Sequence, residues 1–188
     1  MNKNQQTKIS KRLSLILRHN PQSVGLSLGE NGWVEVQPLL DALTERNVTI
    51  DEQILNTVVS NCAKQRFEFD QTKEHIRARQ GHSVEIDLGY TPTTPPDLLY
   101  HGTPKKFVDA ILEEGLKKQR RHHVHMSENI PLMLEVARRR GEPRLLEINA
   151  KQMADEGHEF YLTDNNVWLC SYIPPKFITL KKPETLKI

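Results

Sequence analysis

The fold of the first half of the chain is decided by the stretch FEFDQTKEHIRAR, residues 67–79. Two runs in which apolar and polar residues alternate flank the polar stretch Asp70–Lys73, which can turn the chain. Alternation of this kind predicts a β-hairpin. Ile76 and Ala78 then face a core, and the two arginines that follow them in sequence face the other way.

Three helical patterns precede this hairpin. The first begins near Ile9, after a polar start that we expect to be loosely ordered, and it ends at Asn20-Pro21 because the residue before a proline avoids the α region. The second covers residues 36–43, and Asp51 can cap a third that covers residues 54–62. Three helices followed by a hairpin is the order of a winged helix, an analogy of architecture that fixes no function.

The second half alternates short strands with short helices. Strands are predicted at residues 98–100, 123–126, 145–148, 159–162, 167–169 and 177–180. Helices are predicted at residues 107–112, which Gly115 can close, and at residues 131–140. The stretch GYTPTTPPD, residues 89–97, holds three prolines and is the expected linker. The predicted fold class is α+β. One lobe is expected at residues 1–90, a linker at residues 91–97 and a second lobe at residues 98–188.

Composition is that of a soluble globular protein. The 188 residues are 27% charged and 37% apolar, with a net charge of +2. No apolar run approaches the ~20 residues of a membrane span, and the start lacks the apolar segment of a signal peptide. The two cysteines show no pairing pattern, which favours a reducing, cytoplasmic location. Nothing in the sequence indicates an obligate oligomer, so we expect a monomer without a membrane partner.

Two polar motifs stand at predicted strands of the second half. Residues 100–103, YHGT, follow an apolar run, and a glycine there can let a ligand approach the backbone closely. In residues 121–127, RHHVHMS, alternation places Arg121, His123 and His125 on one face. Histidines two apart can bind zinc, but no Cys, Asp or Glu lies near them and the arginine would repel a cation. An anion or nucleotide pocket fits these charges better, and no metal site is predicted.

Other polar stretches carry weaker signals. Arg77 and Arg79 alone could be solvated side chains on an edge strand, but they lead into QGHS, residues 80–83, a turn rich in donors that suits an anion or a ribose. The arginines at 138–140 have a sufficient structural reason, because cations stabilise a helix C-terminus. Residues 166–169, NVWL, are typical of a core strand.

Taken together, these motifs resemble the RNA 2′-phosphotransferase family, which acts in tRNA splicing in fungi and also occurs in bacteria and archaea. The matching segments occur in family order from about residue 10 to 178, and the ordered set is far more specific than any one segment. They are LSLILRHNP, NGWVEV, KQRFEF, IRARQGHS, LLYHGT, RRHHVHMS, ARRRGEPRLLEINA and NNVWLCSYIPPKF.

The resemblance implies a winged-helix RNA lobe followed by an NAD-binding lobe with an ADP-ribosyltransferase-like mixed β fold. It implies the catalytic residues Arg18, His19, Arg77 and Arg121. It implies the NAD-binding residues His101, Gly102, Thr103, His125, Ser127 and Arg139. The donor-rich turn adds the candidate substrate-binding residues Gln80, His82 and Ser83. Arg120 is the alternative to Arg121, and the spacing to Val124 favours Arg121.

The chemistry implied by the resemblance has two steps and consumes NAD as a co-substrate. The 2′-phosphate of an RNA attacks the NAD ribose and expels nicotinamide, giving a 2′-phospho-ADP-ribosylated RNA. Transesterification then gives 2′-OH RNA and ADP-ribose 1″,2″-cyclic phosphate. Arginines from both lobes can hold the phosphate in forked hydrogen bonds, and His19 would bind it or manage a proton. The scheme requires no metal.

The sequence departs from the family pattern at three positions. Asn166 replaces a glycine, Cys170 replaces a threonine, and Met126 replaces a leucine. Two rival functions stay open: an ADP-ribosyltransferase that modifies phosphorylated nucleic-acid ends, and a non-catalytic nucleic-acid-binding module. A protein target is disfavoured because the segment NNVWLC lacks the glutamate that protein-modifying relatives commonly use.

Overall fold

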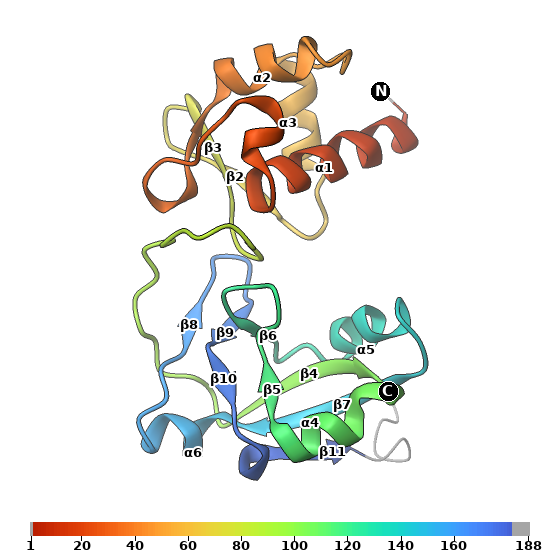
Figure 1. Ribbon diagram of the computed structural model, residues 1–188, viewed down its shortest axis with the longest axis vertical. Helices are drawn as coiled ribbons and strands as arrows, with labels where there is room; N and C mark the ends of the chain where they lie inside the picture. The colour runs from red at the N-terminus through yellow and green to blue at the C-terminus, as the bar shows by residue number, and fades with distance from the viewer. Residues whose placement is uncertain (1, 182–188) are drawn as a thin grey trace. The chain divides into compact units, whose positions relative to one another are not determined.

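A separate hydrophobic core forms in each half of the chain. The computed structural model describes residues 2–181, and it divides the chain between Gly89 and Tyr90 into an N-terminal and a C-terminal unit (Figure 1). The fold is mixed α and β, as predicted, and its sheets are antiparallel with two or three strands each. Within residues 2–181, no helix is both long and apolar enough to cross a membrane.

Helix α1, Lys3–Arg18, opens the N-terminal unit. A capping box starts it: the Asn2 side chain accepts a hydrogen bond from the Gln5 amide at 2.9 Å, and the Gln5 side chain accepts one from the Asn2 amide at 3.0 Å. The expectation of a loosely ordered start was therefore wrong, because this cap extends the helix through the polar residues. The predicted apolar face is buried and consists of Ile9, Leu13, Ile16 and Leu17.

Two further helices complete the predicted order. Helix α2 is Val36–Thr44 and helix α3 is Glu52–Ser60. The Asp51 side chain caps α3 by accepting a hydrogen bond from the Ile54 amide at 2.7 Å, as the sequence indicated. Short 3₁₀ turns, η1 and η2, connect α1 to α2 and cover Pro21–Val24 and Glu30–Gly32.

The predicted hairpin is formed by β2, Phe67–Phe69, and β3, His75–Ala78. Its register places Phe67 opposite Ala78 and Glu68 opposite Arg77. Ile76 and Ala78 are fully buried, as the alternation predicted. A third strand, β1, Val34–Glu35, pairs with the other side of β3. It was not predicted, because two residues are too few to display alternation.

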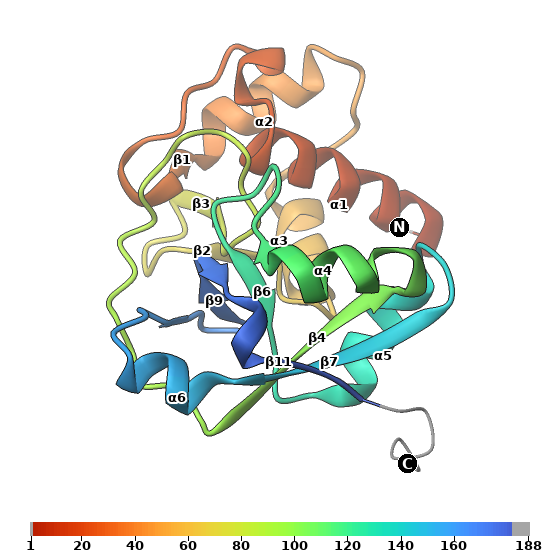
Figure 2. The same ribbon diagram turned by 60° about the horizontal axis from the view of Figure 1, so that its bottom comes forward.

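The C-terminal unit is organised around the pairing of β4, Leu98–Pro104, with β7, Pro143–Asn149. All seven residues of each strand pair in antiparallel register, and β11, Ile178–Lys181, lies along the other side of β7 (Figure 2). Leu99, Leu146 and Ile148 are fully buried in this sheet. The strand β4 is longer than predicted, so the HGT motif lies inside the strand rather than in a turn after it.

The remaining elements of this unit surround that sheet. The helices are α4, Val108–Glu114, α5, Ile130–Arg138, and α6, Ala150–Asp155, with 3₁₀ turns η3 and η4 at Lys105–Phe107 and Pro175–Phe177. Two small sheets are β10–β5 and β6–β9–β8. Their strands are β5 Leu116–Lys117, β6 Val124–Met126, β8 Tyr161–Leu162, β9 Trp168–Cys170 and β10 Tyr172–Ile173. Helix α6 and strands β5 and β10 were not predicted.

Two residues that differ from the pattern named above have defined local surroundings. Asn166 has a φ of 57°, in the left-handed region that favours glycine and that asparagine tolerates better than most residues. Cys170 is 1% exposed and its thiol donates a hydrogen bond to the Tyr172 carbonyl at 3.3 Å, which gives a polar partner to the side chain. The other cysteine, Cys62, is 8% exposed in the N-terminal unit.

Gly102 has a packing reason that the sequence did not reveal. A Cβ at this position would lie 1.9 Å from the carbonyl oxygen of Met133, which belongs to α5. The helix backbone fills the space where a side chain would stand, so this glycine has a packing role whether or not a ligand approaches it, and its role toward a ligand stays a prediction. Gly102 allows α5 to contact β4 directly.

We expect Gly102→Ala to destabilise the protein by at least about 2 kcal/mol, because backbone rather than a flexible side chain blocks the added methyl. Gly157→Ala is the matched control: this glycine has a φ of 91° but nothing lies within 4 Å of an added Cβ. The control should lose only about 1 kcal/mol through backbone strain. Urea unfolding of both variants measures the difference, and equal losses would contradict the packing argument.

Candidate functional site

Arg18, His19 and Ser83, three residues predicted for the site, lie together in the N-terminal unit. The Ser83 amide donates a hydrogen bond to the Arg18 carbonyl at 2.8 Å. The Ser83 hydroxyl lies 2.9 Å from His19 Nδ1, across 64 residues of sequence. The end of α1 and the donor-rich turn after β3 therefore form one polar cluster, as a shared ligand site requires.

The Arg18 side chain reaches the edge of the hairpin. Its Nη2 donates to the Arg66 carbonyl at 3.3 Å, and its guanidinium carbon lies 6.0 Å from the centroid of the Phe67 ring. The Arg66 carbonyl also accepts a hydrogen bond from the Arg79 amide at 3.0 Å. Arg18 is thus attached to the same hairpin that carries Arg77.

Arg77 is held by several groups at once. Its Nε donates to Glu68 at 2.6 Å and its Nη1 donates to the Asn31 carbonyl at 3.2 Å. The guanidinium also stacks on Trp33, 4.6 Å from the ring centroid, which is a favourable cation–π geometry. Arg79 forms an ion pair with the same Glu68 at 3.2 Å. Arg77 and Arg79 are therefore ordered groups and not freely solvated side chains.

The turn after β3 carries two buried polar side chains. His82 is 1% exposed, and its Nε2 lies 3.6 Å from the position that a Cβ on Gly32 would take. The Gln80 side-chain oxygen is buried and has no hydrogen-bond partner among the described residues. A buried acceptor left without a donor costs about 1–3 kcal/mol. The Gln80 oxygen is therefore suited to a donor from a ligand.

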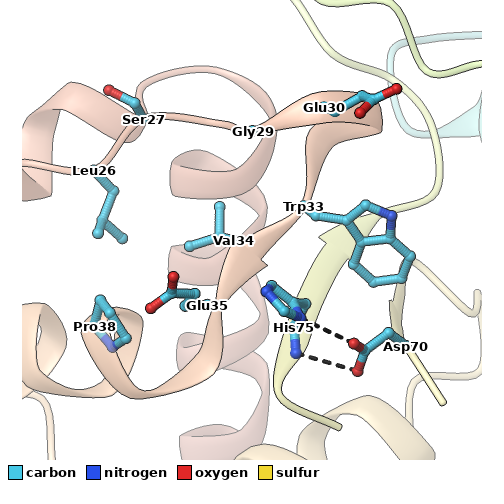
Figure 3. A pocket seen from close by; sticks show the side chains of 10 residues that line it. All are labelled: Leu26, Ser27, Gly29, Glu30, Trp33, Val34, Glu35, Pro38, Asp70 and His75. Atoms are coloured by element: carbon cyan, nitrogen blue, oxygen red, sulfur yellow. Dashed lines mark hydrogen bonds and ion pairs between the residues drawn. The ribbon is translucent and has the colours of Figure 1, made fainter. Parts of the chain in front are cut away.

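A hollow of about 540 Å³ lies in the N-terminal unit, and none of the predicted site residues lines it (Figure 3). Its lining consists of Leu26, Ser27, Gly29, Glu30, Trp33, Val34, Glu35, Pro38, Asp70 and His75. Burial opposes ionisation of Asp70, but hydrogen bonds from His75 outweigh it and lower the Asp70 pKa to about 2. This pair, at 2.9 Å, fixes the turn of the hairpin, and Trp33 connects the hollow to Arg77.

In the C-terminal unit, the two histidine motifs lie side by side. The Tyr100 amide donates to the Ser127 carbonyl at 2.9 Å, and the Ser127 amide donates to the Tyr100 carbonyl at 3.0 Å. His101 Nδ1 lies 2.9 Å from the carbonyl oxygen of His125. Thr103 and Ser127 are buried beside this contact, at 3% and 4% exposure. These bridges place the HGT and HVHMS motifs side by side.

The imidazole of His125 is a neutral group with an unused acceptor. Burial, reinforced by the positive charge of Arg121, lowers the pKa of His125 to about 3, and burial also lowers the pKa of His101. His125 Nδ1 lies 3.0 Å from the His123 carbonyl, which can only accept, so this nitrogen carries the proton. The lone pair then lies on Nε2, which is buried and has no partner among residues 2–181.

Arg121 lies in the bend before β6 and not in the strand. The expectation that it shares a strand face with the histidines is therefore wrong, although its charge still acts on His101 and His125. Burial and the charge of Arg140 lower the Arg121 pKa. No carboxylate in the described part of the chain forms an ion pair with Arg121. An anionic ligand would therefore relieve an unfavourable charge.

The last NAD-binding candidate, Arg139, is the exposed C-cap residue directly after α5. It forms an ion pair with Glu135 one turn earlier on the same helix. Pairs of this spacing on a helix surface contribute only a few tenths of a kcal/mol, about 0.3–0.5, so Arg139 can leave its partner at little cost.

Glu68 and Trp33 are candidate functional residues that the sequence reasoning did not single out. A usable signal was present, because alternation through the hairpin places Glu68 on the same face as Arg77, directly across from it. Trp33 could not be assigned in this way, since its contact with Arg77 spans more than 40 residues of sequence. Within residues 2–181, no group of three His, Cys, Asp or Glu residues could hold a metal ion.

Comparison with known proteins gives a consistent result. The family model described as RNA 2′-phosphotransferase, Tpt1 / KptA family, matches residues 4–172. A protein of Flavobacterium johnsoniae named "Probable RNA 2′-phosphotransferase" is 45% identical over 181 residues, which cover 96% of this chain and 100% of the relative. Proteins of the same name from Nostoc punctiforme and Trichormus variabilis are 48% and 47% identical. Those matches cover 91% and 95% of this chain, and 94% and 98% of the relatives.

The lowered pKa of His125 predicts a loss of stability in acid. The unfolded chain binds a proton at this histidine below its ordinary pKa of about 6.5, whereas the folded protein does so only near 3, so unfolding becomes easier as the pH falls between these values. From about pH 7 to about pH 5, the wild type should lose about 1–2 kcal/mol more stability than His125→Asn. Asparagine can still donate to the His123 carbonyl. Equal pH dependence in urea unfolding would contradict the neutral assignment.

Proposed function

Because the chain belongs to the RNA 2′-phosphotransferase family, we propose that it removes an internal 2′-phosphate from RNA and transfers it to the ADP-ribose part of NAD. The N-terminal unit would act as a winged-helix RNA lobe, which its three helices and hairpin support. The C-terminal unit would act as an ADP-ribosyltransferase-like NAD lobe. NAD is consumed, and the scheme requires no metal.

The observation that carries this proposal is the contrast between Arg121 and the two neutral histidines near it. Arg121 is a cation with a lowered pKa and no carboxylate partner among residues 2–181, which favours a phosphate. His101 and His125 are held neutral, which favours a ribose hydroxyl or a carboxamide. A site that accepts a dianion next to a dinucleotide needs both kinds of group.

In this proposal, residues around the two histidine motifs bind NAD. The unused acceptor on His125 Nε2 fits a hydroxyl or an amide donor. His101, Thr103 and Ser127 surround the same contact between β4 and β6, and Gly102 holds α5 against it. Arg139 can release Glu135 to meet a phosphate of the dinucleotide. NAD supplies an electrophilic ribose carbon with a neutral leaving group, so these residues need only to bind and align.

The chain would act on the RNA phosphate through its arginines. Arg18, Arg77 and Arg121 would hold the phosphate oxygens. One phosphate oxygen attacks the NAD ribose carbon and expels nicotinamide, which gives the 2′-phospho-ADP-ribosylated RNA. In the second step an ADP-ribose hydroxyl attacks the phosphorus and the RNA 2′-oxygen leaves. Charge then builds on the phosphorus oxygens, where guanidiniums stabilise it best. His19, in contact with Ser83, binds the phosphate or moves a proton.

Gln80, His82 and Ser83 are proposed to bind the RNA around the phosphate. Ser83 already joins His19, and the Gln80 oxygen is buried without a donor among the described residues. A ribose hydroxyl is a donor of suitable size for this oxygen. We propose a cytoplasmic location and a monomer.

The proposed function predicts the products of one incubation. Purified protein, NAD and an RNA oligonucleotide with one internal 2′-phosphate should give 2′-OH RNA, nicotinamide and ADP-ribose 1″,2″-cyclic phosphate, which mass spectrometry identifies. A stable ADP-ribosylated RNA, or modification of a phosphorylated RNA end, would instead support an end-modifying ADP-ribosyltransferase. Binding of RNA without any turnover would support a non-catalytic module.

Arg121→Ala is expected to lower turnover by about 100-fold or more, because one guanidinium that contacts developing charge is lost. The 2′-phospho-ADP-ribosylated RNA should accumulate if the second step is the more sensitive one. Arg120→Ala is the matched control, since it removes the neighbouring charge but should keep most activity. If Arg120→Ala is the inactive variant, the two roles are reversed.

A further inference from the structure

Glu68 lies between two arginines of the hairpin, and both of its oxygens are used. Oε1 accepts a hydrogen bond from Arg77 Nε at 2.6 Å, and Oε2 lies 3.2 Å from Arg79 Nη1. Only 13% of the Glu68 side chain is exposed, against 20% for Arg77 and 19% for Arg79. Charge-assisted bonds shielded from water fix geometry far better than an exposed ion pair does.

Two further contacts fix the Arg77 guanidinium. The Trp33 ring lies under it at 4.6 Å, and the Asn31 carbonyl accepts from Nη1 at 3.2 Å. Asn31 and Gly32 both have a positive φ, of 53° and 81°, and this tight turn brings the carbonyl and the ring to the arginine. The guanidinium is therefore held along one edge by Glu68, on one face by Trp33 and at Nη1 by Asn31.

One nitrogen of Arg77 remains available. No group among the described residues accepts a hydrogen bond from Arg77 Nη2, although Nε and Nη1 both have acceptors. The two protons of Nη2 can therefore meet an anion without breaking any contact that orients the group. A guanidinium fixed in this way loses little conformational freedom on binding, which favours tight and directional contact with a phosphate.

The charge balance also leaves Arg77 able to attract an anion. A single carboxylate paired with a single guanidinium would cancel its charge. Here Glu68 is shared by Arg77 and Arg79, so the three side chains together keep one positive charge. Arg79 thus shares the carboxylate with Arg77, so Glu68 orients Arg77 without serving it alone.

We propose that Glu68 is a positioning residue, which aims the available nitrogen of Arg77 at the RNA 2′-phosphate. The proposal rests on the function proposed above. Glu68 does not touch the RNA in this scheme, and a carboxylate close to a phosphate would repel it. Its effect reaches the reaction only through the orientation of Arg77, and that orientation matters most when charge builds on the phosphorus oxygens in the second step.

Glu68→Gln tests the proposal directly. Glutamine keeps the size of the side chain and one acceptor oxygen, but it loses the negative charge and can no longer accept from both arginines at once. We expect the rate of the second step to fall by about 10- to 100-fold, the first step to change much less, and the 2′-phospho-ADP-ribosylated RNA to accumulate. Single-turnover reactions with labelled RNA resolve the two steps, and KM for NAD should not change.

Two other variants serve as controls. Glu68→Asp keeps the charge with a shorter reach and should recover part of the second-step rate. Glu45→Gln removes the exposed partner of Arg46 in the same unit, at 77% exposure, and should behave as the wild type does. A purely structural loss would lower both steps by the same factor, together with the melting temperature, and would produce no intermediate. That result, or wild-type kinetics in Glu68→Gln, would overturn the proposal.

A second measurement separates this proposal from the proposed function. In ¹H–¹⁵N spectra, the Nε–H signal of Arg77, assigned by its loss in Arg77→Lys, should be protected from exchange in the wild type. The Nε proton should exchange with water faster in Glu68→Gln, but it should stay protected in Glu45→Gln. An unchanged Arg77 signal in Glu68→Gln would refute the positioning role even in an active enzyme. If the wild type removes no 2′-phosphate, the proposed function fails while the spectra still decide whether Glu68 orients Arg77.

Discussion

The antiparallel pairing of β4 with β7 is the constraint on which the C-terminal unit depends. Seven consecutive residue pairs fix β4 along one side, and the bridge between Tyr100 and Ser127 fixes it along the other. The HGT motif therefore has no freedom to move as a loop would. Because Gly102 lets α5 contact this strand, the helix and the histidine pair are positioned by the same few residues.

In the N-terminal unit, strand pairing fixes the positions of charged side chains. The hairpin register sets Glu68 opposite Arg77, so an ion pair that would be weak on an open surface becomes part of a fixed, half-buried arrangement. In the C-terminal unit, burial lowers the pKa of His101 and His125, so both histidines stay neutral. The N-terminal unit thus holds charged groups in fixed positions, whereas the C-terminal unit combines neutral histidines with the nearby cation Arg121.

Periodicity was sufficient to predict the elements that display it over several residues. The buried face of α1, the cap of α3 and the hairpin with Ile76 and Ala78 inside all follow from local patterns. Strands of two residues such as β1 and β5 have no period to detect. The polar start of α1 was missed because its capping box uses Asn2 and Gln5 rather than the more familiar Ser or Thr with Glu.

The surroundings of a candidate site residue could be predicted only where they depend on neighbours within the same short segment. Alternation indicated that Val124 and Met126 face a core, and both are buried. The packing role of Gly102 could not be predicted, because its neighbour, Met133, belongs to a later helix whose position no local pattern reveals. The placement of Arg121 failed for a related reason: the strand begins at Val124, and a strand boundary is among the least reliable features of a sequence.

The two cysteines give the molecule one internal reporter for each unit. Cys62 is buried in the core of the N-terminal unit and Cys170 in that of the C-terminal unit. A thiol reagent reaches a buried sulfur only while the surrounding structure is open. The labelling rates at the two positions therefore measure the opening equilibria of the two halves independently, in one native sample and without any engineered probe.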